Sequence, residues 1–359
     1  MYYRRILSKK YRFLWGLLLL SVLGCIDPIN LTLEDEDEFL VIDGGLTNSV
    51  GTHPLTVYYA TGQRTSARRA VTDAQIRLIA DTGEQWNYTE TTDGTYELPM
   101  VQGQAGVSYR IAMDLSDGQT YESQLEKMPE LIRGANAYWE LMERPVLNRN
   151  GFPFDRPFVD LYLDTELPVG RDYWLKWDVF TMYAYPEVQC SPLGPPPKIC
   201  YFTEEPTAQE INLFNGSNFE NTSLERLPLT TKDIPTLNSE FRNKFYFLVN
   251  QKSITSTAHD YWRRINAITN QTGSVFDAPP APVVGNVVNP NDESEIVLGF
   301  FEVSNVDSLR TFITSQDIRT LYAFPEETCR AGNPLNLFER ACCNCQLLPD
   351  ASLDRPAWW

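Results

Sequence analysis

Residues 92–123, TDGTYELPMVQGQAGVSYRIAMDLSDGQTYES, carry the pattern that decides the fold class of this chain. Asp93-Gly94 and Asp117-Gly118 are tight-turn signals, and between them apolar and polar residues alternate with the period of two that strands have. The alternation extends back through three earlier runs, FLVIDGGLTN at 39–48, HPLTVYYA at 53–60 and AQIRLIAD at 74–81. Strands this short, repeated at roughly ten-residue intervals, are typical of a β-sandwich, which we expect at residues 39–128.

The rest of the chain continues the β pattern with one exception. Strand-like runs recur at PFVDLYLDTE (157–166), RDYWLKWDVFTMYAY (171–185), EFRNKFYFLVNQKSIT (240–255) and EIVLGFFEVSNVDSLRTFI (295–313). The segment at 257–273, TAHDYWRRINAITNQTG, instead spaces Tyr261, Ile265 and Ile268 along one face of a helix, and Gly273 is a stop signal. The sequence therefore predicts an all-β protein. An N-terminal immunoglobulin-like or transthyretin-like β-sandwich is followed by a larger β-rich domain with one helix.

The N-terminus has the features of a bacterial lipoprotein signal. Five basic residues precede residues 14–25, LWGLLLLSVLGC, whose apolar run is too short to span a membrane. A cysteine directly after Leu23-Gly24 matches a lipobox, in which the thiol takes a diacylglycerol. We expect a signal peptide at 1–24, lipidation of Cys25 and a tether at 25–38. The alternative is an ordinary secretory signal with a chance cysteine.

The charge of the chain narrows the choice of partners and of location. The sequence has 30 Lys and Arg against 47 Asp and Glu, and removing the five basic residues of the signal leaves 25 − 47 = −22. Nucleic acid needs the opposite sign, so we expect no nucleic acid partner and membrane contact through the lipid anchor only. The unbroken acidic run at 34–38 resembles a signal that sends some bacterial lipoproteins to the outer face; a solvated spacer is the alternative. We expect a lipid anchor in the outer membrane, with the protein facing the cell exterior.

The cysteines predict disulfides within the larger domain, residues 129–359. With Cys25 assigned to lipid, six remain for up to three disulfides in an exported protein: Cys190, Cys200, Cys329, Cys342, Cys343 and Cys345. Cys190 and Cys200 flank the Pro-rich segment SPLGPPPKI, so we expect them to pair and to close that loop. The other four lie in a Cys-rich C-terminal segment, where a zinc site is the alternative, although C-C-x-C is a poor match to the usual zinc knuckles.

No catalytic constellation is evident in the sequence. The chain has two His, His53 and His259, and it lacks the nucleophile-elbow, P-loop and zincin motifs. We therefore expect a protein that is not an enzyme and that holds no metal and no cofactor. A two-carboxylate glycosidase stays open because Asp and Glu are plentiful. The polar run NPNDE at 289–293 lacks the spacing of a calcium loop and is more typical of a hairpin tip.

Aromatic residues beside the Pro-rich loop are candidates for binding a partner. They are Tyr183, Tyr185, Tyr201 and Phe202. Exposed aromatics next to a pre-organised loop suit a protein interface, so we expect these four side chains to contact a partner. The alternative is that they belong to the hydrophobic core, where aromatics of β-sandwiches more often lie.

Several segments are informative when taken together. They are the lipobox, FLVIDGGLTN, the stretch from Tyr261 to Ser304, the cysteine pattern and the C-terminal RPAWW, with Phe276-Asp277, Gly285-Asn286 and Leu298-Gly299 with Phe301 as the best markers. Over residues 39–359 the chain resembles the domain of unknown function 4249 family of Bacteroidota lipoproteins, which has no established catalytic residues.

The resemblance implies a function without identifying a reaction. Members of that family accompany TonB-dependent outer-membrane receptors, which implies a surface lipoprotein that acts as an accessory or ligand-capture subunit of a TonB-dependent transporter. An extracellular hydrolase acting on glycan or peptide and a structural assembly factor of the cell envelope are the alternatives.

Overall fold

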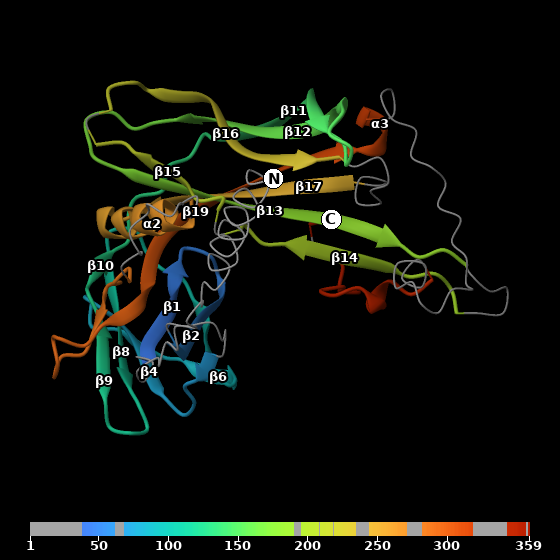
Figure 1. The fold of residues 1–359 in the computed structure, drawn as a ribbon. Helices are drawn as coiled ribbons and strands as arrows, with labels where there is room; N and C mark the ends of the chain where they lie inside the picture. Colours follow the sequence, from blue (N-terminus) through green and yellow to red (C-terminus); the bar gives the residue numbers. More distant parts are fainter. Residues whose placement is uncertain are drawn as a thin grey trace, which may run out of the picture.

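The computed structural model describes residues 38–61, 68–189, 195–207, 209–217, 219–234, 244–270, 282–318, 343–356 and 358–359. Within these ranges the protein is all-β, as predicted, and its strands form three sheets (Figure 1). The largest sheet contains β1 (Glu38–Thr47), β2 (Gly51–Thr61), β3 (Arg68–Ala70), β6 (Thr89–Thr92), β7 (Thr95–Val101), β13 (Trp174–Pro186), β14 (Ile199–Glu204), β15 (Asn212–Asn215), β17 (Lys244–Ile254) and β19 (Val297–Thr314). The second contains β4 (Gln75–Ala80), β5 (Gln85–Asn87), β8 (Ser108–Asp114), β9 (Thr120–Ser123), β10 (Glu126–Lys127) and β18 (Val287–Val288). The third contains β11 (Asn136–Leu147), β12 (Pro153–Glu166) and β16 (Ser223–Asp233).

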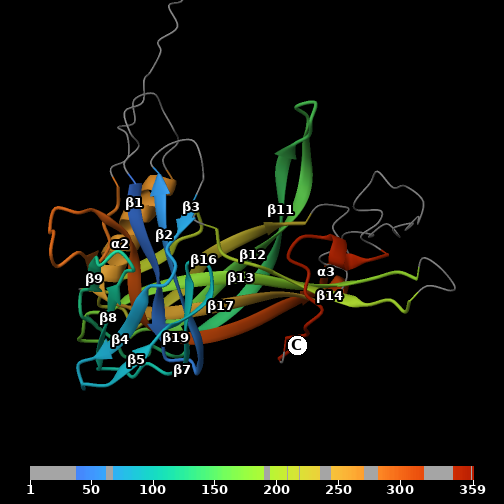
Figure 2. The same ribbon diagram turned by 90° about the horizontal axis from the view of Figure 1, so that it is seen from below.

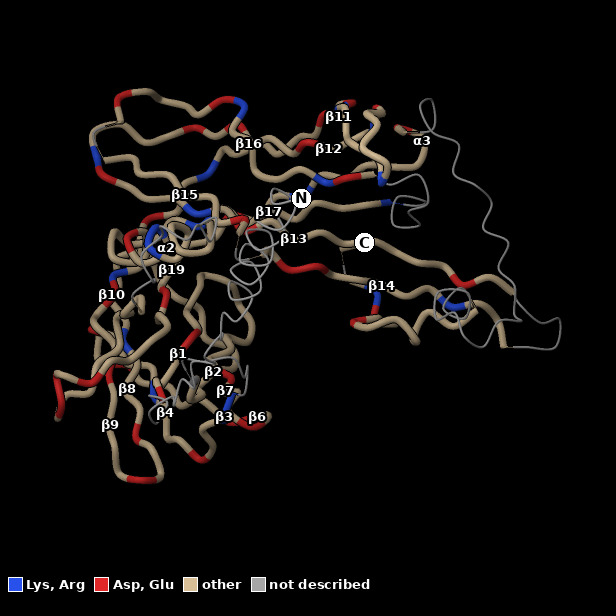
Figure 3. Tube along the Cα trace, in the orientation of Figure 1, with Lys and Arg blue, Asp and Glu red and all other residues tan. Residues whose placement is uncertain are grey.

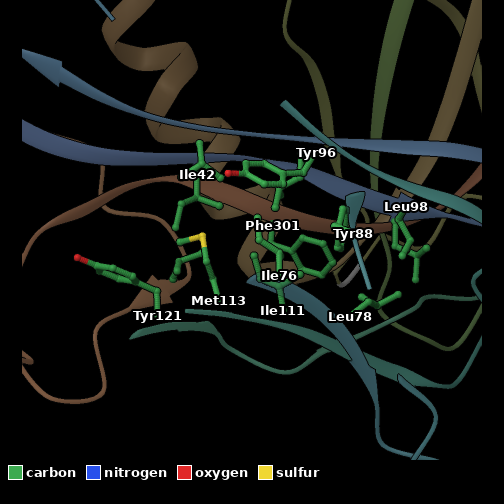
Figure 4. Close-up of a cluster of buried hydrophobic side chains, with 14 of the residues drawn as sticks. Ile42, Ile76, Leu78, Tyr88, Tyr96, Leu98, Ile111, Met113, Tyr121 and Phe301 are labelled. Carbon is green, nitrogen blue, oxygen red and sulfur yellow. The ribbon is translucent and has the colours of Figure 1, made fainter. Parts of the chain in front are cut away.

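The first hydrophobic core lies between the largest sheet and the second sheet (Figure 4). The alternation predicted for residues 74–81 is present in β4, where Ile76 and Leu78 point inward and are buried. β8 repeats it, with Ile111 and Met113 buried in the same core. Alternating burial of this kind is what a period-two sequence pattern produces when one face of a sheet is covered.

β19 joins the two halves of the molecule. Its residues 297–304 pair in parallel with β1, and its residues 305–314 pair antiparallel with β17. The first core accordingly includes Phe301 and Val303 of β19 as well as Val287 of β18. A boundary at residue 128 therefore does not divide the chain into two self-contained units, because strands from the C-terminal part complete the first sandwich.

The second hydrophobic core lies between the third sheet and the β13–β17 part of the largest sheet. Leu161 of β12 and Phe247 of β17 are fully buried there. Trp177 of β13 is also buried, and its indole N–H donates to the Gln251 side chain at 2.9 Å. The Gln251 amide in turn donates to the Ile132 carbonyl at 3.0 Å, so these two side chains are paired, whereas the buried Tyr173 hydroxyl of the same core has no hydrogen-bond partner among the described residues.

The helix predicted at 257–273 is confirmed as α2 (Ser256–Thr269). The Thr255 side chain caps its N-terminus by accepting the Ala258 N–H at 3.1 Å. The helix ends at Asn270, earlier than expected, and Gly273 lies outside the described residues. A four-residue helix, α3 (Ser315–Ile318), and the short 3₁₀ turn η2 (Cys345–Leu347) were not predicted from the sequence.

Markers of the family resemblance have a structural role where they are described. A Cβ on Gly285 would lie 1.5 Å from the Gly299 carbonyl oxygen, so the two backbones can meet only without side chains. The Asn286 side chain accepts the Phe301 N–H at 2.9 Å and donates to the Phe301 carbonyl at 3.0 Å. These residues fasten the segment before β18 onto β19, whereas Phe276-Asp277 lies outside the described residues.

The predicted Cys190–Cys200 disulfide was wrong. Cys200 is bonded to Cys345, with their Cα atoms 5.9 Å apart, and Cys343 is also in a disulfide. The reason is that β14 turns the Cys200 side chain inward, beneath the C-terminal segment, where it is fully buried. Because Cys343 and Cys345 are both oxidised, the zinc alternative that used them is also wrong. The remaining cysteines lie outside the described residues: Cys25, Cys190, Cys329 and Cys342.

We predict that the β1–β19 pairing fails when Gly299 gains a side chain. Gly299 has φ of +87°, and its Cβ would lie 2.0 Å from the Ile42 carbonyl oxygen. Gly299→Ala should lower the free energy of unfolding by about 3 kcal/mol or more, because left-handed strain and a steric clash add. Urea denaturation measures the loss.

Gly118→Ala is the matched control. Gly118 has φ of +91° with no atom within 4 Å of a built Cβ, so the variant should lose only about 1–2 kcal/mol from strain. Equal losses in the two variants would contradict the close β1–β19 contact.

Candidate functional site

A cavity of about 850 Å³ opens on the face of the largest sheet that points away from both cores. Charged side chains from four neighbouring strands form its floor, because residues at every second position of a strand share one face. α2 supplies Trp262 and Ile265 to one wall, and the segment after β14 supplies residues 205–207. The charged floor residues are Asp43 of β1, Lys176 and Asp178 of β13, Lys252 of β17 and Glu302 of β19.

Two lysines and two carboxylates of the floor form a closed network. Lys176 lies directly across from Lys252, a pairing that would be repulsive alone. Asp178 lies between them, with its carboxylate 3.0 Å from the Lys176 Nζ and 2.8 Å from the Lys252 Nζ. Glu302 is 3.3 Å from the Lys252 Nζ, which completes the second side of the network. Each buried charge is thus paired, the condition for keeping ions out of water.

Trp262 closes the network from the helix side. Its indole N–H donates to the Glu302 carboxylate at 2.6 Å. The Lys176 Nζ lies 4.0 Å from the centre of the same ring, in cation–π contact. Tyr261 stacks on Phe300 of β19 and holds this face of α2 against the sheet. The helix therefore positions one aromatic ring over the charged floor.

The ion pairs of the network favour the charged forms of Glu302, Asp178 and Lys252. Burial raises the pKa of Glu302, but Lys252, Lys176 and the Trp262 N–H outweigh it and lower that pKa to about 2. Burial likewise opposes ionisation of Asp178 and Lys252, yet their ion pairs lower the pKa of Asp178 and raise the pKa of Lys252. The carboxylates contribute stability above their unfolded pKa values, 3.8 and 4.5, and lose it as the pH falls through the lowered values.

Asp43 differs from the other four floor residues. Within the described ranges, no hydrogen bond or ion pair of its carboxylate is present, and its side chain is accessible from the cavity. Desolvation by the surrounding protein, and then the charge of Glu302, raise the pKa of Asp43, and the two lysines only partly offset them. Asp43 is the one floor carboxylate with room for a bound ligand.

Sequence reasoning missed all five floor residues, although a signal for them exists. Each is a charged residue that interrupts an apolar strand run, as in VIDGG, WLKWDV, VNQKSI and FFEVS. Isolated charges of this kind look like solvated positions in a half-exposed strand. Only the pairing of β13, β17, β19 and β1 brings the charges together.

The structure places the four predicted partner-binding aromatics together, but not as one exposed surface. Tyr183 and Tyr185 on β13 and Tyr201 and Phe202 on β14 lie on paired strands. Phe202 is buried against the Cys200–Cys345 disulfide, and Tyr183 stacks on Phe202 with ring centres 5.0 Å apart. Phe202 therefore belongs to a core, which corrects its assignment as a partner contact. Tyr185 and Tyr201 are partly exposed, and Tyr201 packs edge-on against Trp359.

The two histidines are buried on different elements, His53 on β2 and His259 on α2. His53 is buried, and its Nε2 lies 2.7 Å from the Val101 carbonyl oxygen. His259 is buried in the first turn of α2, which lowers its pKa by desolvation. Across the described part of the chain, no group of three or more His, Cys, Asp or Glu is arranged to hold a metal ion. Nor is any helix there both long and apolar enough to cross a membrane.

The fold and the cavity define an all-β protein whose two cores share one sheet and whose charged site lies on the open face of that sheet. A family profile described as "Domain of unknown function (DUF4249)" matches residues 26–310, and the chain belongs to this family. No curated protein matches the sequence.

We predict that Lys252→Met destabilises the fold by about 3 kcal/mol, because it leaves Glu302 and Asp178 short of a partner in a buried setting. Guanidinium denaturation at neutral pH measures the loss. Arg263→Ala is the control, since its ion pair with Asp260 is exposed on both sides and should contribute less than about 1 kcal/mol. A loss as small for Lys252→Met would show that the network is solvated rather than buried.

Proposed function

We propose that this protein is a lipid-anchored surface protein that captures a small cationic ligand in the charged cavity and delivers it to a TonB-dependent outer-membrane transporter. The observation that carries the proposal is Asp43, a carboxylate without a partner on the floor of a cavity of about 850 Å³. A ligand amine or guanidinium would supply the opposite charge and form a charge-assisted hydrogen bond with the Asp43 carboxylate.

The charge of the cavity lining supports a cationic ligand. The lining contains five carboxylates and two lysines, a difference of 2 − 5 = −3. The lysines are already held by Asp178 and Glu302, so they offer little to an anion. The excess negative charge therefore faces the cavity and favours a cation over an anion or a neutral molecule.

An extracellular hydrolase is the second candidate, because one observation favours it. The pKa of Asp43 is raised and the pKa of Glu302 is lowered. Two carboxyl groups whose pKa values differ in this way resemble the general acid and the general base of a hydrolase. Binding is favoured because Lys252 and the Trp262 N–H engage the two Glu302 oxygens. A carboxylate held in that way is a poor nucleophile or base. Release of product from glycan or peptide by the purified protein would support the hydrolase instead.

The membrane location in this proposal rests on the lipobox, and the transporter rests on the family resemblance. We predict that Cys25→Ala moves the protein from the membrane fraction to the soluble fraction, because lipidation is the anchor. The measurement is fractionation of cells after a high-salt wash, with labelled palmitate incorporation as a second readout. Retention of the variant in washed membranes, or continued labelling, would contradict the anchor.

We predict that Asp43→Asn weakens binding of putrescine by about tenfold or more, because a charge-assisted hydrogen bond is lost. Isothermal titration measures the affinity, with 1,4-butanediol as the neutral analogue of putrescine. Affinity of the unmodified protein should rise with pH through the raised pKa of Asp43, because only the ionised carboxylate attracts the cation. Equal affinity for putrescine and 1,4-butanediol, or no binding of either, would contradict the proposal.

The melting temperature of Asp43→Asn shows whether weaker binding could result from unfolding. A carboxylate whose folded pKa is raised destabilises the fold at neutral pH, and this effect disappears below its unfolded value of 3.8. Asp43→Asn should therefore melt at a higher temperature than the parent at neutral pH. Weakened binding by the variant then cannot be attributed to unfolding. Asp81→Asn, an exposed position away from the cavity, should change neither property.

A further inference from the structure

The β11–β12 hairpin projects from the body of the protein (Figure 2). β16 pairs with β12 only as far as Phe158, so the hairpin continues beyond that point as a two-stranded ribbon within the described structure. A two-stranded ribbon is marginally stable in water alone. A projecting ribbon that is well formed therefore indicates a surface that becomes covered.

The turn at the end of this hairpin is ordered by its own hydrogen bonds. The Asn148 side chain accepts the backbone N–H groups of Asn150 and Phe152 at 2.9 and 3.0 Å. The Asn148 N–H donates to the Phe152 carbonyl at 2.9 Å. The side chains at the tip are thus presented in a fixed arrangement, which lowers the entropy lost when they are buried.

The hairpin tip, defined as residues 146–154, is apolar on both faces. Phe152 is 66% exposed and Phe154 is 41% exposed. Val146 lies across from Phe154 and shares its face, whereas Leu147, 71% exposed, lies on the other face opposite Pro153. A flat protein interface would cover one face of a ribbon. A tip that is apolar on both faces suits end-on insertion into a medium that surrounds it.

The charge of the tip also differs from that of the whole chain. Acidic positions are spread over both halves of the protein (Figure 3), whose net charge is −17. The tip contains no carboxylate, and Arg149 is its one charged residue. Arginine beside exposed Phe and Leu is the composition of a segment that enters the interface of a bilayer, with the guanidinium at the headgroups.

We propose that the hairpin tip inserts into the membrane to which Cys25 is anchored and forms a second, non-covalent contact, in addition to the lipid anchor to which the net charge alone would restrict membrane contact. In Figure 2 the start of β1 and the β11–β12 turn point to the same side of the molecule. The 38 − 25 = 13 residues from Cys25 to Glu38 can reach about 45 Å when extended, so the anchor alone does not fix the orientation of the protein. Insertion of the tip fixes that orientation. The inference rests on the lipid anchor of the proposed function.

The test uses the Cys25→Ala chain, so that acyl groups do not dominate, and vesicles of phosphatidylcholine with phosphatidylglycerol. Flotation should recover the protein with the vesicles. Leu147→Asp combined with Phe152→Asp should reduce the bound fraction by about tenfold or more, because the two apolar side chains that insert into the bilayer are replaced by charged ones. Val169→Asp is the matched control, because Val169 is equally exposed, 66%, in the turn that follows the other end of β12, and it should leave binding unchanged.

Any of three flotation results would overturn the inference: no flotation of the Cys25→Ala chain, equal flotation of the tip variant, or an equal loss in the Val169→Asp control. Loss of cross-linking to a membrane receptor with unchanged flotation would also overturn it, because the tip would then contact protein. Putrescine binding should be the same in the tip variant as in the parent. A negative flotation result would therefore contradict membrane insertion without contradicting the cavity proposal.

Discussion

The parallel pairing of β1 with β19 is the interaction on which the rest of the structure depends. It joins residues 40–47 to residues 297–304, so the first described strand lies beside one of the last. Parallel neighbours need a long connection, and here the connection is most of the protein. Gly299 permits the contact because it lacks a Cβ, which would overlap the Ile42 carbonyl.

Beyond residue 304 the same strand pairs with β17, so one strand contributes to both hydrophobic cores. The family markers near Gly285 and Asn286 fasten a neighbouring segment to this strand, which explains why they mark the family without indicating a reaction.

The same pairing creates the charged cavity. Glu302 occupies the part of β19 next to β1, and Lys252 and Lys176 follow on the next two strands. Burying four charges on one sheet face costs free energy that apolar residues of similar size would not cost. The network is therefore weak evidence for a role in stability. Asp43 lies on the same floor, and no hydrogen bond or ion pair within the described residues engages its carboxylate.

The periodicity of the sequence predicted the features that neighbouring residues determine. The alternating strands, the helix around Tyr261 and the all-β class follow from side-chain periodicity, which acts over a few residues. The β1–β19 pairing did not follow, because a strand's sequence does not indicate which distant strand will lie beside it. The Cys200–Cys345 disulfide was not predicted either, because its two cysteines are 145 residues apart in the sequence and only the fold brings them together. Phe202 was assigned to the surface because its inward direction depends on the C-terminal segment that covers it. The floor of the cavity was missed since a charge such as Lys252 is solvated or buried according to the strands beside it.

Amide hydrogen exchange on the whole protein tests most directly the claim that β19 makes the two cores one unit. If β19 joins them, the buried amides of β1, at residues 40–46, and those of β17, at residues 245–249, open with the same free energy, that of global unfolding. We predict one common opening free energy for both groups of amides, and we expect it to fall by the same amount in both groups in Gly299→Ala. Two values, with the β1 amides exchanging through a separate and easier opening while β17 stays protected, would contradict it.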